Sequence, residues 1–260
     1  MKKFFAICLA LLLTMSALTG CGAADADSDL AAIRKNGQIV VGITDYAPMD
    51  YKDENGEWTG FDAEFARLFA KELGVEVEFF VIADWGQKVF ELDSKNIDAI
   101  WNGMTITEEI TLNTSCSDPY VVNAQVVVMK ADVAANYPDT DSLKGLTFAV
   151  ESGSAGESAL TDLGITGYVA VQDQAKAVME VSAGTADACV IDITMANAMT
   201  GEGTNYDDLA AGIALTSEEY GVAFRKGSDL TAKFNAFMDK CIADGTLPAL
   251  AEKYSLTLAG

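Results

Sequence analysis

The segment from Gly103 to Tyr120 reads GMTITEEITLNTSCSDPY and is crowded with hydroxyl and acid side chains. It contains no Lys, Arg or His. Hydroxyl groups donate and accept hydrogen bonds and carboxylates accept them, so side chains of this kind hold a small molecule by hydrogen bonds. The segment therefore predicts one wall of a binding site, and that wall brings no cationic side chain of its own.

The absence of histidine from all 260 residues limits the chemistry available. Ser–His–Asp and Cys–His nucleophiles are excluded, and any proton transfer would fall to Asp or Glu, which makes an enzyme a less favoured interpretation. Cys116, Cys189 and Cys241 are too scattered, and odd in number, to form a disulfide framework. Without histidine they also predict no zinc site. We interpret them as small core residues and expect no metal and no cofactor.

The charge balance bears on the class of partner. The chain has 39 acidic and 17 basic residues, a formal net charge of −22. Such a balance argues against nucleic acid as a partner and against adhesion to anionic lipid. It mildly favours cationic solutes, although acidity also simply keeps a protein soluble.

The first 20 residues have the pattern of a signal peptide. Lys2 and Lys3 precede the apolar run FFAICLALLLTMSAL, which is shorter than the roughly 20 residues of a membrane span. The run is followed by LTGC, which resembles a bacterial lipobox, and Cys21 opens the polar stretch CGAADADSD. We therefore predict cleavage before Cys21 and a lipid anchor on its thiol, since two acyl chains give stable membrane attachment. A plain secretory signal with a chance cysteine is the alternative.

An alternation of strands and helices must position the polar segment. QIVVGI (38–43) is predicted to be a buried strand, residues 62–74 an amphipathic helix that ends at Gly74, and VEVEFFVI the next strand. A helix follows from about Gln87, and IDAIW (97–101) is predicted to be a third strand. This βαβαβ rhythm predicts a parallel sheet that binds ligands at the carboxyl ends of its strands.

A second unit of similar design begins near Leu143. LTFAVE and GYVAV are predicted strands around a glycine-rich turn and a helix, and residues 172–192 supply another helix and strand. The extended stretch NAQVVVMKADV joins the two units. Residues 220–226 are predicted to form a strand, and helices over 229–243 and 247–254 then return to cover the first unit. Two chain crossings between two units are typical of a hinged clamp.

Six stretches carry a specific likeness in order and spacing: GFDAEFARLFAKELG, NIDAIWNGMTIT, SDPY, SLKGLTFAVESGS, GTADACVID and YGVAFRKGSDL. With them the chain resembles, over about residues 37–255, the family 3 extracytoplasmic solute-binding proteins, the receptors of polar amino-acid ABC importers. The resemblance implies an α/β fold of the two-lobed periplasmic-binding-protein type (type II), each lobe a mostly parallel sheet flanked by helices, with the ligand cleft between the lobes. It divides the chain into a signal peptide (1–20), a lipid-anchored linker (21–36), lobe 1 (37–129 and 222–260) and lobe 2 (130–221).

The resemblance also implies the ligand-binding residues. Tyr46 and Trp85 align with aromatics that sandwich the solute. The groups that hold an α-carboxylate align with Asn102, Gly103 and Thr105. In lobe 2 the glycine-turn residues are Glu151, Ser154 and Ala155, and the acid that takes an α-ammonium aligns with Asp192.

One position departs from the family pattern. Ile110 stands where the family normally has Arg to pair the α-carboxylate. Loss of one partner from a buried charge pair costs roughly 2–5 kcal/mol. The acids Asp192 and Glu151, with Asp45 as a further candidate, are expected to face a cleft without a protein cation, so a cationic amine is one predicted ligand. A zwitterionic amino acid held by backbone N–H groups at the turn from Gly153 to Gly156 is the other.

We therefore expect a monomeric, non-enzymatic solute-binding lipoprotein of an ABC importer. It would bind an amino acid or a related small amine by lobe closure and deliver it to a membrane permease with its ATPase. Its predicted location is extracytoplasmic and lipid-anchored at the cell membrane. A sensory lipoprotein that feeds a signalling partner, or a dehydratase-like enzyme on the same fold, are the alternatives.

Overall fold

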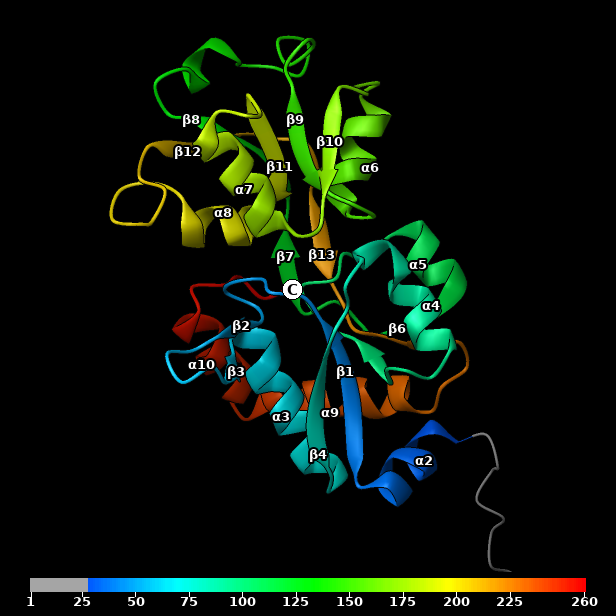
Figure 1. The fold of residues 1–260 in the computed structure, drawn as a ribbon. Helices are drawn as coiled ribbons and strands as arrows, with labels where there is room; N and C mark the ends of the chain where they lie inside the picture. Colours follow the sequence, from blue (N-terminus) through cyan, green and yellow to red (C-terminus); the bar gives the residue numbers. More distant parts are fainter. Residues whose placement is uncertain (1–27) are drawn as a thin grey trace, which may run out of the picture.

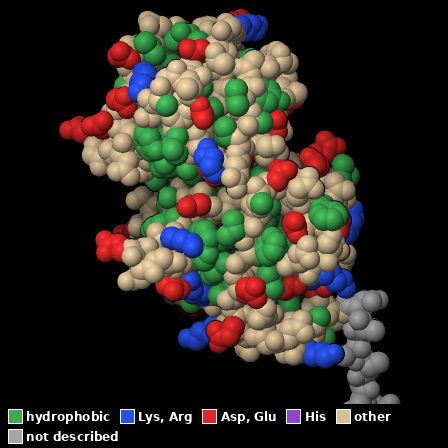
Figure 2. Space-filling view, viewed as in Figure 1, with side chains coloured by type: hydrophobic (Ala, Val, Ile, Leu, Met, Phe, Trp, Pro, Cys, Tyr) green, Lys and Arg blue, Asp and Glu red, His purple; other side chains and the backbone are tan. Residues whose placement is uncertain are grey.

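The computed structural model describes residues 28–260, so the predicted signal peptide and Cys21 lie outside the described residues. Two lobes, each built on one five-stranded sheet with helices around it, are stacked with a narrow connection between them (Figure 1). On the face shown in Figure 2, acidic side chains are scattered over both lobes rather than gathered in one patch, and the outline of the molecule narrows between the lobes.

Lobe 1 holds five strands in the order β4 (Glu76–Val81), β1 (Gln38–Ile43), β5 (Ala99–Ile100), β14 (Ala223–Arg225) and β6 (Thr114–Cys116). β1 runs parallel to β4 and β5, as the βαβαβ rhythm predicts. β14 pairs antiparallel with β5 and β6. β4, β1, β5 and β6 therefore point the same way, so the sheet is mostly parallel, and β14 is reversed because the chain that returns from lobe 2 enters the sheet in the opposite direction.

Lobe 2 holds five strands in the order β10 (Tyr168–Val171), β9 (Phe148–Glu151), β11 (Ala188–Asp192), β8 (Gln125–Lys130) and β12 (Leu209–Ala214). β9, β10 and β11 are parallel, whereas β8 is antiparallel to both β11 and β12. The predicted boundary places residues up to 129 in lobe 1. That boundary was wrong for β8, because this strand pairs wholly within the second sheet.

The connection between the lobes is a two-stranded ribbon of β7 (Val121–Asn123) and β13 (Glu218–Tyr220) (Figure 1). The C-terminal segment joins it, since the Val122 amide donates to the Thr257 carbonyl at 2.9 Å. The predicted single strand over 220–226 is therefore two strands, β13 in the hinge and β14 in lobe 1, with Gly221 and Val222 between them.

The core of lobe 1 is aromatic. Helix α3 (Phe61–Leu73) ends at Gly74 as predicted, and helices α9 (Leu230–Ala243) and α10 (Thr246–Lys253) return to pack near it. The rings of Phe65 and Phe237 lie 5.4 Å apart, and those of Trp101 and Phe234 lie 4.9 Å apart. Burial of large aromatic rings contributes much of a core's stability, so the closing helices complete lobe 1.

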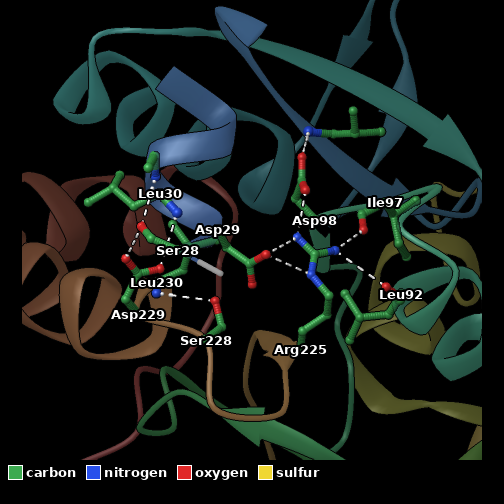
Figure 3. Close-up of polar contacts among 12 residues, drawn as sticks. Ser28, Asp29, Leu30, Leu92, Ile97, Asp98, Arg225, Ser228, Asp229 and Leu230 are labelled. Atoms are coloured by element: carbon green, nitrogen blue, oxygen red, sulfur yellow. Dashed lines mark hydrogen bonds and ion pairs between the residues drawn. The ribbon is translucent and has the colours of Figure 1, made fainter. Parts of the chain in front are cut away.

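The N-terminal part of the described chain is a helix, α2 (Asp29–Asn36), in place of the last part of the predicted linker. Arg225 holds it in place: its guanidinium donates to Asp29 at 2.9 Å, to Asp98 at 2.8 Å and to the Ile97 carbonyl at 2.6 Å (Figure 3). Ser28 caps the helix and also donates to Asp229 at 2.6 Å. Ser28 at its start and the left-handed Gly37 at its end are local signals for this helix, whereas its place against lobe 1 depends on partners distant in sequence.

The remaining elements complete the two lobes. Cys189 and Cys241 are buried and Cys116 is half-buried, which confirms the first two as core residues. No helix within residues 28–260 is both long and apolar enough to cross a membrane. The other elements of lobe 1 are β2 (Tyr51–Lys52), β3 (Trp58–Thr59), a 3-10 turn at Trp85–Gln87, α4 (Lys88–Asp93) and α5 (Glu108–Asn113). The other elements of lobe 2 are a 3-10 turn at Ala134–Asn136, α6 (Ala155–Asp162), α7 (Gln174–Ala183) and α8 (Ile193–Met199).

Candidate functional site

A cavity of about 300 Å³ lies between the lobes. It lies where strands of both sheets end and where α4, α5 and α6 begin, as expected for α/β sheets. Lobe 1 contributes Tyr46, Trp85, Lys88, Asn102 to Thr105 and Thr107 to Ile110; lobe 2 contributes Gln125, Glu151, Gly153 to Ala155, Ser158, Asp162, Gln174 and Asp192.

The two lobes touch at a pair of glycines beside this cavity. A Cβ atom added to Gly153 in lobe 2 would lie 2.4 Å from the Cα of Gly86 in lobe 1. Gly153 has φ +69°, a conformation that glycine adopts without strain. Next to this contact, the ammonium of Lys88 donates to the Gly153 carbonyl at 3.0 Å. The structure thus has the lobes in direct backbone contact on this side of the cleft.

Tyr46 lies at the meeting point of both lobes and the hinge. Its hydroxyl is 2.5 Å from the hydroxyl of Thr194 in lobe 2 and 2.5 Å from that of Tyr220 in the hinge. Thr194 and Tyr220 are themselves 2.9 Å apart. All three side chains are buried. Tyr46 therefore lines the cavity, and its hydroxyl joins the two lobes.

Trp85 and Ile110 form an apolar part of the lobe 1 wall. Both are buried and belong to one cluster with Leu92 and Met104. Ile110 is placed by α5, whose first turn is capped by Thr107, because the Thr107 hydroxyl accepts from the Ile110 amide at 3.2 Å. The position at which the family resemblance implies Arg is thus filled by a packed hydrocarbon side chain.

The polar groups of the lobe 1 wall already have partners within the chain. The Asn102 side chain bonds the Thr44 amide at 2.9 Å and the Thr44 hydroxyl at 2.7 Å. The Gly103 amide donates to Asp62 at 2.6 Å, and the Thr105 hydroxyl donates to Glu218 at 2.8 Å. In this closed arrangement these residues hold the wall itself in shape.

The lobe 2 wall carries two buried acids. Burial raises the pKa of Glu151 to about 8, the charges of Asp192 and Asp173 add to the rise, and Lys88 opposes it. Burial, with the charge of Glu218, raises the pKa of Asp192 to about 6. Both acids are placed at the ends of parallel strands, β9 and β11, which explains why residues so distant in sequence share one wall.

Three side-chain amides support Asp192. Gln125 donates to its carboxylate at 2.8 Å, and Asn123 and Gln174 also donate to it. Gln125 and Gln174 line the cavity but were not predicted, because glutamine at a strand start or a helix start carries no distinctive signal.

Ser154 and Ala155 begin helix α6 at the edge of the cavity. The Ser154 hydroxyl accepts from the Glu157 amide at 3.1 Å, and the Glu157 carboxylate in turn accepts from the Gly153 amide at 2.7 Å. The chain itself therefore supplies acceptors for the amides of Gly153 and Glu157 at this end of the helix. Asp45 is exposed and does not line the cavity, so the structure does not bring it together with the other candidates.

Lys88 corrects the expectation that the cleft has no protein cation. It is the first residue of α4, and its ammonium lies 5.0 Å from the centre of the Trp85 ring. Burial lowers its pKa, while Glu109, Glu151 and Asp84 oppose that effect. Lys88 is absent from the predicted site residues, although its position three residues after Trp85, at the start of a helix that follows a strand end, is where cleft residues are expected.

Within residues 28–260 no group of three or more His, Cys, Asp or Glu side chains is arranged to hold a metal ion. Two lobes, a ribbon hinge and a polar cavity closed from both sides define a clamp-like solute-binding protein. A family model described as bacterial extracellular solute-binding proteins, family 3, matches residues 39–257. The chain belongs to this family.

Individual relatives match this chain over most of its length. The L-cystine-binding protein TcyJ of Escherichia coli is 31% identical over 229 residues, which cover 86% of this chain and 85% of that protein. The arginine-binding extracellular protein ArtP of Bacillus subtilis is 31% identical over 261 residues, 98% of each chain.

Solved structures agree in fold. A mutant of ArgBP from T. maritima has a TM-score of 0.81 at 32% identity and covers 86% of this chain and 98% of its own. The ancestral amino acid-binding protein AncCDT-1, a precursor of cyclohexadienyl dehydratase, has a TM-score of 0.80 at 33% identity and covers 87% of this chain and 99% of its own.

Proposed function

We propose that the protein is the substrate-binding component of an ABC importer and that its ligand is an amino acid or a closely related nitrogenous solute. The observation that carries this proposal is the cavity walled by both lobes, with buried acids on lobe 2 and aromatic and hydroxyl groups on lobe 1. A ligand that bonds both walls favours the closed form, because it binds that form more tightly than the open one. Relatives named for cystine, arginine and glutamine binding support the amino-acid class.

Calorimetric titration with the common amino acids and with diamines tests this function. We expect at least one of these solutes to bind and Asp192→Ala to weaken that binding, because Asp192 is the buried acid at the end of β11 that faces the cavity. Asp187 is exposed and directly precedes the start of β11, so Asp187→Ala is the matched control that removes one carboxylate away from the cavity. Unchanged affinity in Asp192→Ala would show that the ammonium site lies elsewhere.

The role in the membrane is a further part of the proposal. Cleavage before Cys21 with lipid on its thiol would hold the protein outside the cell at the membrane, as a monomer beside the permease and its ATPase. Mass spectrometry of the protein from membranes would detect the lipid, and Cys21→Ser would release the protein to the soluble fraction. A sensory role is the competing outcome, and it is supported if a bound solute alters a signalling partner but is not imported.

An enzymatic role is the weaker candidate. AncCDT-1 is an amino acid-binding protein described as the precursor of a dehydratase, so the fold admits such a change. We propose a binder because three side-chain amides hold the carboxylate of Asp192. Turnover of a bound solute, followed by mass spectrometry, would reverse this assignment.

A further inference from the structure

Lys88 is a half-buried cation in the cleft without an ion pair. Its Nζ atom donates to the Trp85 carbonyl at 3.3 Å and to the Gly153 carbonyl at 3.0 Å. Among residues 28–260, no carboxylate oxygen lies within the 4.0 Å of an ion pair to this nitrogen. Withdrawal of an ammonium from water without a carboxylate partner is costly, so a lysine at this place in a ligand cavity indicates that a partner arrives with the ligand.

The hydrogen-bond capacity of Lys88 leaves room for that partner. An ammonium group has three N–H donors, and the two carbonyls occupy two of them. The Gly153 carbonyl belongs to lobe 2, so closure of the lobes sets the direction of the ammonium as well as its position. One donor therefore remains for an anionic group that enters the cavity.

Three acids that line the cavity, Glu108 and Glu109 of lobe 1 and Asp162 of lobe 2, are exposed to solvent, whereas the remaining charged side chains are arranged by wall. Lys88 is the sole basic side chain among the described residues that line it, and it belongs to lobe 1. Glu151 and Asp192 face it from lobe 2. Ile110, on the same wall as Lys88, adds hydrocarbon and no charge. A ligand with a positive end toward lobe 2 and a negative end toward lobe 1 matches this arrangement.

We propose that Lys88 binds the anionic group of the ligand, so that this cleft selects a zwitterion over the amine of the same skeleton. The inference rests on the proposed function and adds to it the residue that recognises the carboxylate. It also separates the two ligand classes that the sequence leaves open, since a cleft for simple amines gains nothing from a lysine among its lining residues.

The test compares each amino acid that binds with the amine formed by removal of its α-carboxylate, for example L-arginine with agmatine and L-lysine with cadaverine. Dissociation constants are measured by calorimetry for the wild type, Lys88→Met, Lys88→Arg and the control Lys71→Met. Lys71 is exposed on α3 and does not line the cavity, so its loss makes the same change in net charge away from the ligand.

We expect the wild type and Lys71→Met to prefer the amino acid over its amine. In Lys88→Met the amino acid should bind about 10- to 100-fold more weakly while the amine changes little, so the preference disappears. Lys88→Arg should retain part of the preference because it keeps the positive charge. Thermal unfolding of each unliganded variant confirms that all four proteins are folded.

Three outcomes would overturn the inference. One is a wild type that prefers amines, and another is a Lys88→Met variant that keeps the preference for the carboxylate. The third is an equal change for both members of each pair, which would mean that Lys88 acts only as a latch between the lobes. These outcomes leave the proposed function intact, whereas a wild type that binds neither amino acids nor amines refutes the function itself.

Discussion

Substitution of Gly153 by alanine should open the clamp. The added Cβ would lie 2.4 Å from the Cα and 2.7 Å from the amide nitrogen of Gly86, which are backbone atoms of the opposite lobe. Backbone cannot move aside as the end of a flexible side chain can. The lobes must therefore separate at this point, and the bond from Lys88 to the Gly153 carbonyl must lengthen with them.

The magnitude has two parts. Alanine at φ +69° is strained in open and closed forms alike, by about 1–2 kcal/mol, which lowers stability without favouring either form. The clash exists only in the closed form. Overpacking of a tight contact costs about 1–3 kcal/mol, which predicts ligand binding about 5- to 150-fold weaker.

A matched control separates the two parts. Gly164 follows α6 with φ +70°, and no atom lies within 4 Å of a Cβ built on it. Gly164→Ala should therefore share the loss of stability and keep wild-type affinity. Calorimetry measures the affinity, and small-angle X-ray scattering compares the compactness of the liganded proteins. If Gly153→Ala binds as tightly as Gly164→Ala and is equally compact, the glycine contact does not control closure.

Two further predictions concern stability. Arg225→Met should lower the free energy of unfolding by about 2–4 kcal/mol, because it leaves Asp29 and Asp98 without their partner (Figure 3). Arg225→Lys should recover only part of this loss, since lysine lacks the planar guanidinium that bonds both carboxylates. Equal urea midpoints for Arg225→Met and wild type would contradict this prediction. Glu151→Gln should flatten the pH dependence of stability. The folded state holds a proton on Glu151 up to a pKa of about 8, whereas the unfolded chain releases it near the ordinary pKa of 4.5. The wild-type free energy of unfolding should thus fall as the pH rises from about 4.5 to about 8, and an identical slope in Glu151→Gln would contradict the assignment.

Much of the fold could be predicted because its signals are local. The apolar run of β1, the amphipathic pattern of α3 and the glycine that ends this helix are set by residues near one another in the chain. The order of the strands and helices, and the glycine turn at Gly153, follow from the same kind of signal. The family resemblance then supplied the cleft and most of its candidate residues.

The departures have a common cause in long-range partners. β8 pairs with β11, some 60 residues later, rather than with the lobe that precedes it. The place of helix α2 against lobe 1 depends on Arg225 at the far end of the sequence, and Asp45 turns to solvent although it lies next to Tyr46. No periodicity in these segments shows which partner they will meet.

The sequence by itself determined the class of protein, the two α/β units and the loss of the expected arginine at Ile110. Only the tertiary structure decided which side chains share the cleft and with what charge. Lys88 is a lysine at a helix start in the sequence, but in the folded protein it is the cation that faces Glu151 and Asp192 from the opposite wall. The physical reason is that strand and helix patterns depend on neighbours in sequence, whereas the charge of a cavity depends on which side chains closure brings within a few ångströms of one another.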